Sequence, residues 1–214
     1  MAGPDERDRR PGPMNATDGR LGNVSAALVL GGASERMGSD KARVELAGAP
    51  AAVRLAERLA FVCEEVLLVG GEPPEGAPGR RVPDPEGPRC ALRGLVGALE
   101  AAQEERVLVL ATDLFGATPE LLLALIAAPE ADVVAPRTER GPEALCALYR
   151  REPALREARA RLAAGRLALH ELLGALSVHW LEGDDLLALG APERTLANLN
   201  TQADLAAFRR GAAK

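Results

Sequence analysis

The residues with the clearest chemical potential form the segment LGGASERMGSDK, at positions 30–41. Gly31 and Gly32 permit positive φ angles and close backbone approach, so that consecutive N–H groups can point at one anion. Arg36 and Lys41 add two mobile positive charges, one a planar fork and the other a point charge. This combination predicts a loop that captures the phosphates of a nucleotide.

Two common phosphate-binding motifs do not fit this segment. The P-loop requires GxxxxGK[ST], and here the lysine follows Ser-Asp instead. The dinucleotide motif GxGxxG is absent. A solvent-exposed turn rich in glycine and charge is the alternative interpretation that composition alone leaves open.

The elements that must position this loop alternate between short apolar runs and longer helical patterns. We expect strands at 24–30, 65–70, 106–113, 131–136, 144–150 and 176–183. We expect helices at 49–62, 91–103, 118–128, 152–165 and 168–175, the third opening with Thr118-Pro119, and loop at 71–81. This alternation predicts an α/β fold of three layers, Rossmann-like, with a mostly parallel sheet and helices on both faces.

Such a sheet holds its ligand beyond the carboxyl ends of its strands. Polar segments follow strand ends at four places, namely the loop at 31–41, the turn around Asp84, Thr112-Asp113, and NLNT at 198–201. We therefore expect these four segments to meet in one cleft. We predict one domain at 23–210, preceded by a disordered tail at 1–22 that has almost no apolar residues.

Composition excludes several classes of function. The net charge of −5 and the pI near 5.3 argue against a nucleic-acid partner or an anionic membrane surface. The three cysteines, Cys63, Cys90 and Cys146, are widely spaced, and we interpret them as buried thiols. The N-terminus has no apolar signal-peptide core, and no run of about 18 apolar residues occurs. We expect a cytoplasmic protein without a membrane segment.

The loop resembles the LAGGxSxRMGxDK signature of the molybdenum cofactor guanylyltransferases. These enzymes are nucleotidyltransferases with a fold of the nucleotide-diphospho-sugar transferase type. The matching positions are Gly31, Gly32, Ser34, Arg36, Met37, Gly38, Asp40 and Lys41. The resemblance continues at Asp84, at Asp113, in CALYR at 146–150 and in NLNTQADL at 198–205, and it spans about 24 to 208.

The resemblance implies transfer of GMP from GTP to the terminal phosphate of molybdopterin, which yields the guanine dinucleotide form of the cofactor and pyrophosphate. It implies Mg²⁺ as the metal cofactor. It also leaves room for a protein that delivers the molybdenum cofactor or accepts the product. The chemistry agrees with the residues, because a phosphate nucleophile needs charge stabilisation at the α-phosphorus rather than a Ser-His-Asp device.

The resemblance also assigns roles to individual residues. The implied catalytic residues are Arg36, Lys41 and Asp113. The implied nucleotide-binding residues are Val29, Leu30, Gly31, Gly32, Ser34, Lys41, Asp84 and Asp113, and the implied metal ligands are Asp113 and Asn200.

Each of the polar assignments has a structural alternative. Asp84 could form a simple Asp-Pro turn, and Asp113 could be a turn former or helix cap. The NLNT segment could serve a helix, because Thr201 and Asp204 fit a capping pattern.

Two segments depart from the family pattern. CALRGL at 90–95 replaces the usual GPLAGL, and ATDLFG at 111–116 replaces PCDxPF, although Asp113 is kept. These departures keep alternatives open: a molybdopterin cytidylyltransferase, another small-molecule nucleotidyltransferase, or a divergent non-catalytic nucleotide-binding protein.

Overall fold

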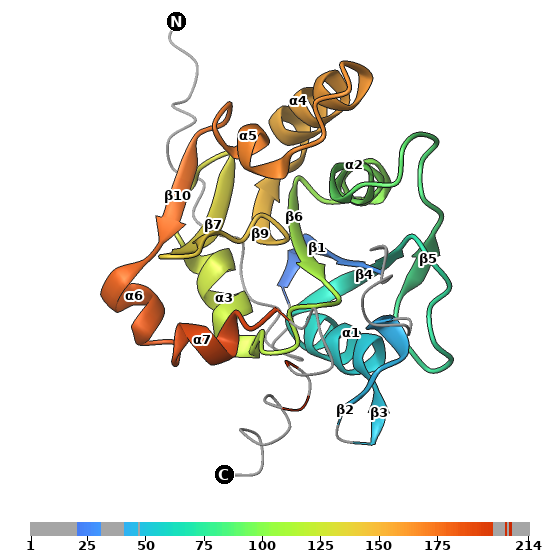
Figure 1. Ribbon diagram of the computed structural model, residues 1–214, viewed down its shortest axis with the longest axis vertical. Helices are drawn as coiled ribbons and strands as arrows, with labels where there is room; N and C mark the ends of the chain where they lie inside the picture. The colour runs from blue at the N-terminus through green and yellow to red at the C-terminus, as the bar shows by residue number, and fades with distance from the viewer. Residues whose placement is uncertain (1–20, 31–40, 47, 199–203, 205, 207–214) are drawn as a thin grey trace, which may run out of the picture.

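The protein is built around one mixed β-sheet, seen in a computed structural model that describes residues 21–30, 41–46, 48–198, 204 and 206. The strands are β1 (Leu21–Val29), β4 (Cys63–Val69), β5 (Arg80–Val82), β6 (Arg106–Ala111), β7 (Val133–Thr138), β8 (Gly141–Pro142), β9 (Cys146–Arg150) and β10 (Val178–Leu181). Their order is β10-β7-β9-β6-β1-β4-β5, and β8 pairs with β7 (Figure 1). The predicted α/β class is thus confirmed.

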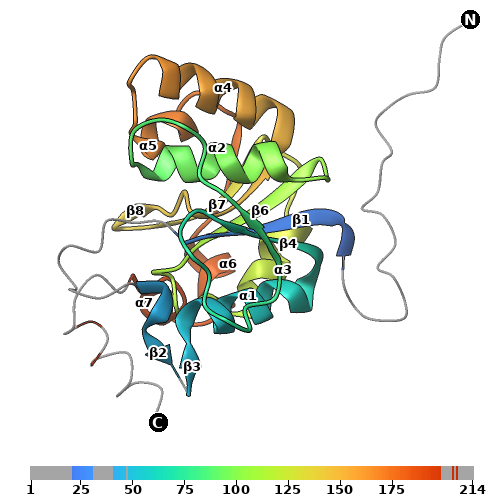
Figure 2. The same cartoon turned by 90° about the vertical axis from the view of Figure 1, so that its right-hand side faces the viewer.

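Helices cover both faces of this sheet (Figure 2). The longer ones are α1 (Ala51–Val62), α2 (Ala91–Ala101), α3 (Pro119–Ala127) and α4 (Arg151–Ala163), and the short ones are α5 (Leu169–Leu173), α6 (Gly183–Leu187) and α7 (Pro192–Thr195). Helices α2, α4 and α5 pack on one face, and α1 and α3 on the other. A one-turn 3-10 helix, η2 (Lys41–Arg43), and the small ribbon of β2 (Glu45–Leu46) and β3 (Ala49–Pro50) precede α1.

The central strand β1 explains why the sheet needs two helical layers. Ala26 and Leu28 point into the core shared with α1 and α3, whereas Ala27 and Val29 point into the core shared with α2. All four side chains are at most 2% exposed. A strand that is apolar on both faces is typical of a parallel sheet covered on both sides.

Local sequence signals set several of the element boundaries. The Thr118-Pro119 start of α3 is confirmed, because the Thr118 hydroxyl accepts a hydrogen bond from the Leu121 N–H at 3.3 Å. Pro50 lies one residue before α1, where its missing N–H costs no helical bond.

Three features of the fold differ from the expectation. Strand β5 includes the last two residues of the segment 71–81 that we expected to be loop, and it pairs with β4 in parallel. Strand β9 runs antiparallel to both of its neighbours, β6 and β7. Strand β1 begins at Leu21, two residues before the expected domain boundary at 23, so residues 21–22 are not part of a disordered tail. The rest of that predicted tail lies outside the described residues, as does most of the helix that the Thr201 and Asp204 capping pattern would begin, although Asp204 and Ala206 are helical.

The cysteines are free thiols, and two of the three are buried as expected. Burial raises the pKa of Cys63 and of Cys146 to about 12. Cys90 is only half-buried, directly before α2. In the described part of the chain, no helix has both the length and the hydropathy that a membrane span requires.

Candidate active site

The carboxyl ends of four strands meet at one edge of the sheet and bring the predicted segments together. The Leu30 N–H donates to the Val69 carbonyl oxygen at 2.8 Å, and the Thr112 N–H donates to the Val29 carbonyl oxygen at 3.2 Å. On the far side of β4, the Gly70 N–H donates to the Val82 carbonyl oxygen at 2.9 Å. The end of β1, the Thr112-Asp113 segment and the chain that leads to Asp84 therefore lie along one edge.

The predicted phosphate loop leaves β1 at this edge and returns through η2. Leu30 is buried on one side of the loop, and Ala42 is buried on the other, in the core beneath α1. Lys41 is the first residue of η2. The predicted site residues Gly31, Gly32, Ser34, Arg36 and Asn200 lie outside the described residues.

Asp113 follows β6 in a turn that is fixed from two sides. From α1, the Arg58 guanidinium donates to the carbonyl oxygens of Phe115 and Ala117, at 2.8 and 2.7 Å. From the other side, Gly116 lies so close to α7 that a β-carbon at this position would come within 1.7 Å of the Arg194 carbonyl oxygen. The turn that carries Asp113 is therefore held tightly in place.

Glu143 is a candidate site residue that the sequence interpretation missed. It precedes β9, and because β9 is antiparallel, the start of this strand lies at the same edge as the end of β6. The Asn198 side chain donates to the Glu143 carboxylate at 3.0 Å. Burial raises the pKa of Glu143, the Asn198 hydrogen bond opposes this shift, and the negative charge of Asp113 adds to it. Asp113 and Glu143 therefore both lie at the carboxyl edge of the sheet, next to the paired ends of β6 and β9.

The donor set of this cluster fits a divalent metal ion. Asp113, Glu143 and Asn198 offer carboxylate and amide oxygens, which Mg²⁺ and similar hard cations prefer. Among the described residues, no group of three or more His, Cys, Asp or Glu side chains is arranged to hold a metal. Two carboxylates and an amide suit a site in which substrate phosphates and water complete the coordination.

Asp84 lies beyond β5 and pairs with an arginine of α2. The Arg93 guanidinium donates to Asp84 Oδ2 at 3.0 Å and to the Gly87 carbonyl oxygen at 2.8 Å. The side chains of Arg93 and Asp84 are 14% and 29% exposed. Arg93 belongs to the CALRGL segment that departs from the family pattern, and no pattern in the sequence predicts this ion pair.

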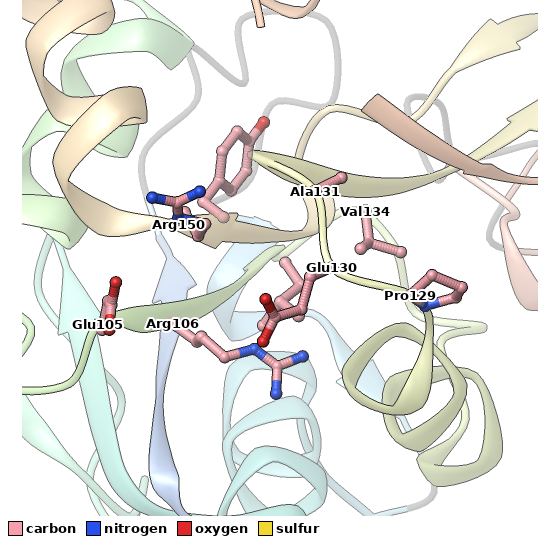
Figure 3. A pocket seen from close by; sticks show the side chains of 9 residues that line it. Glu105, Arg106, Pro129, Glu130, Ala131, Val134 and Arg150 are labelled. Atoms are coloured by element: carbon pink, nitrogen blue, oxygen red, sulfur yellow. The ribbon is translucent and has the colours of Figure 1, made fainter. Parts of the chain in front are cut away.

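A separate hollow of about 400 Å³ lies at the opposite edge of the sheet (Figure 3). Its lining includes Arg106 at the start of β6 and Arg150 at the end of β9. Both arginines already have partners: Arg106 donates to the Ile126 carbonyl oxygen and faces Glu130, and Arg150 pairs with Asp132 at 3.5 Å. Because ligands of such sheets bind at the carboxyl edge, we do not assign this hollow to the nucleotide.

Comparisons with known proteins agree with the fold and with the motif. Several relatives bear the name "Probable molybdenum cofactor guanylyltransferase", and two of them are compared with this chain. The one from Chloroflexus aggregans is 35% identical over 194 residues, which cover 85% of this chain and 91% of the relative. The one from Deinococcus radiodurans is 34% identical over 187 residues, which cover 86% and 92%.

Solved structures support the same fold. The molybdopterin-guanine dinucleotide biosynthesis protein A of Archaeoglobus fulgidus superposes with a TM-score of 0.74 at 21% identity, over 88% of this chain and 98% of that protein. The 2-C-methyl-D-erythritol 4-phosphate cytidylyltransferase of Thermus thermophilus gives 0.66 at 17% identity, over 89% and 100%. These likenesses confirm the predicted nucleotide-diphospho-sugar transferase type of fold.

The family comparison covers most of the sheet and both helical layers. Residues 26–178 match the family described as "MobA-like NTP transferase domain". This segment includes every strand of the large sheet except residues 21–25 of β1 and residues 179–181 of β10. The chain therefore belongs to the MobA-like NTP transferase family and is a nucleotidyltransferase.

Proposed function

We propose that this protein transfers a GMP unit from GTP to the terminal phosphate of molybdopterin and releases pyrophosphate. The observation that carries the proposal is the meeting of the end of β1, Asp113 and Asp84 at one sheet edge, in a chain of the MobA-like family. Relatives at 34 to 35% identity over most of their length bear the name of this activity. We further propose that the nucleotidyltransferase domain expected at 23–210 is a single domain, and that it begins with β1 at Leu21.

The chemistry of each residue indicates its role in binding and catalysis. The backbone at Val29, Leu30, Gly31 and Gly32, with Ser34, would cradle the phosphates of GTP. Arg36 and Lys41 would balance the charge that develops at the α-phosphorus and on the leaving pyrophosphate. Asp84 would contact the nucleoside.

Asp113 would be the principal metal ligand, supported by Asn200. The position of Glu143 adds a second carboxylate, and Asn198 orients it through the 3.0 Å hydrogen bond. A bound Mg²⁺ would supply a Lewis acid for the phosphate oxygens. The negative charge of Asp113 contributes to the raised pKa of Glu143, and a cation bound between the two carboxylates would offset this repulsion.

The nucleophile needs no activation by a general base. A phosphate oxygen of molybdopterin is ionised at neutral pH and attacks the α-phosphorus of GTP, whose bond to the bridging oxygen breaks as pyrophosphate leaves. Positioning and charge stabilisation can account for catalysis of this kind. A protein of molybdenum cofactor biosynthesis would deliver molybdopterin to this enzyme or accept the product.

The test is calorimetric titration of the purified protein with GTP, CTP and UTP, each with and without Mg²⁺. We expect the tightest binding for GTP with Mg²⁺, followed by pyrophosphate release when molybdopterin is added. Tighter binding of CTP would instead support a cytidylyltransferase. Nucleotide binding without pyrophosphate release would support a non-catalytic binding protein.

A further inference from the structure

The first turn of α2 carries an arginine whose guanidinium faces the loop at 83–90. Both terminal nitrogens of Arg93 are engaged there, one by Asp84 Oδ2 at 3.0 Å and the other by the Gly87 carbonyl oxygen at 2.8 Å. The guanidinium thus joins the carboxylate to the backbone of its own turn. Because the guanidinium is planar and rigid, these two hydrogen bonds fix both the position and the orientation of the Asp84 carboxylate relative to the turn.

Close packing of α2 against the sheet fixes the position of the backbone that carries Arg93. A β-carbon on Gly94 would lie 2.7 Å from Val29 Cγ1, and one on Gly97 would lie 2.9 Å from Pro85 Cδ. The helix therefore touches the last residue of β1 on one turn and the Asp84-Pro85 segment on the next. Arg93 is held at a defined place between the start of the phosphate loop and the nucleoside end of the proposed site.

The Asp84 carboxylate is confined from the opposite side as well. Gly70 follows β4 with φ of 73°, and a β-carbon there would lie 2.7 Å from Asp84 Oδ1. The positive φ and the close approach both require glycine. One oxygen of Asp84 is thus taken by Arg93, while the other lies against the backbone at Gly70.

We propose that Arg93 is a positioning residue that acts through Asp84 to set nucleotide affinity and base preference. The fixed carboxylate can accept a hydrogen bond from an O–H or N–H of the nucleoside in only one direction. Without the guanidinium, Asp84 would be free to rotate and would accept from differently placed donors. The inference rests on the proposed function, because it takes Asp84 as a nucleoside contact.

The experiment compares Arg93→Met and Arg93→Lys with the parent protein. Methionine keeps the length of the side chain but has no donor, and lysine restores the charge without the fork. We expect Arg93→Met to raise the Kd of GTP about tenfold, as for the loss of a charged hydrogen bond. We expect it to narrow the preference for GTP over CTP and UTP and to leave kcat at saturating GTP within about threefold. Arg93→Lys should recover part of the affinity.

A double-variant cycle tests whether the effect passes through Asp84. If it does, Arg93→Met should add little to the loss already caused by Asp84→Asn. The matched control is Arg159→Met, which removes another arginine that bonds to α2, through Glu100 at 2.8 Å near the far end of the helix. The control should leave the Kd of GTP unchanged.

The outcomes separate this inference from the proposed function. A parent protein that binds GTP tightly, together with an Arg93→Met variant that binds all three nucleotides as the parent does, would overturn the positioning role alone. Additive losses in the double variant would also overturn it, since Arg93 would then act independently of Asp84. Equal losses of Tm in Arg93→Met and Asp84→Asn, with the parent's GTP affinity kept in both variants, would mark the pair as merely structural. A parent that binds no nucleotide would overturn both proposals.

Discussion

Replacing Gly116 by alanine tests the most constrained contact near the candidate site. The added methyl carbon would lie 1.7 Å from the Arg194 carbonyl oxygen, whereas real β-carbons essentially never approach closer than 3.0 Å. The turn or α7 must therefore move by at least 1.3 Å. Arg58 anchors the turn on its other side through Phe115 and Ala117, so the displacement cannot be absorbed there without breaking those bonds.

The expected magnitude follows from this displacement. Overpacking costs about 1–3 kcal/mol, and for a protein of this size about 2 kcal/mol lowers Tm by roughly 4–8 °C. If the turn moves, Asp113 moves with it, and if α7 moves, Asn198 and its bond to Glu143 move instead. In either case an oxygen of the metal site that we propose is displaced by about 1 Å, which we expect to lower kcat by about 10²-fold.

The assay is thermal denaturation together with pyrophosphate release at saturating GTP. The matched control is Gly174→Ala, because Gly174 ends α5 with φ of −67° and a β-carbon there would meet its nearest atom at an ordinary 3.5 Å. We expect the control to keep the parent's Tm and kcat. A Gly116→Ala protein with parental Tm and kcat would show that the turn and α7 do not pack as closely as described.

Three further predictions concern charge. Lys41→Ala should lower kcat by about 10²–10³-fold, as for the loss of one electrostatic donor, and an unchanged kcat would remove Lys41 from the mechanism. Asp113→Asn and Glu143→Gln should each shift the Mg²⁺ dependence of turnover, and of GTP binding by calorimetry, to higher Mg²⁺; titrations that superpose on the parent's would contradict the metal assignment. The Ser177 hydrogen bonds lower the pKa of Asp132, so its stabilising effect is present above the unfolded pKa of about 4 and is lost as pH falls through the lower folded value. The Tm difference between the parent and Asp132→Asn should therefore narrow as pH falls from 6 toward 3, and a constant difference would argue against this.

The sequence predicts the central strands well because they are buried on both faces. Runs such as 24–30 and 106–113 have no polar residue facing either helical layer except near their ends, so their pattern leaves little choice. Strand β5 was missed for the opposite reason. It has three residues, two of them exposed arginines, and it exists because Leu67–Val69 offers a partner, which no local pattern reveals.

The direction of β9 could have been inferred, and Glu143 with it. Only residues 139–145 separate β7 from β9, and a parallel crossover needs a dozen residues or more. An antiparallel β9 starts where β6 ends, which places the segment before Cys146 beside Asp113. The pairing of Arg93 with Asp84 gave no comparable signal, because it depends on how closely α2 approaches the strand ends.

The hydrogen bond between Asn198 and Glu143 has a consequence for how the protein matures during synthesis. The strands from β1 to β9 have left the ribosome once residue 150 and the tunnel length beyond it are made, and chains fold from the N-terminus as they emerge. Asn198 follows almost fifty residues later. A nascent chain can thus assemble the nucleotide side of the cleft while Glu143 still lacks its hydrogen bond to Asn198, so the metal site that we propose should be complete only after Asn198 has emerged.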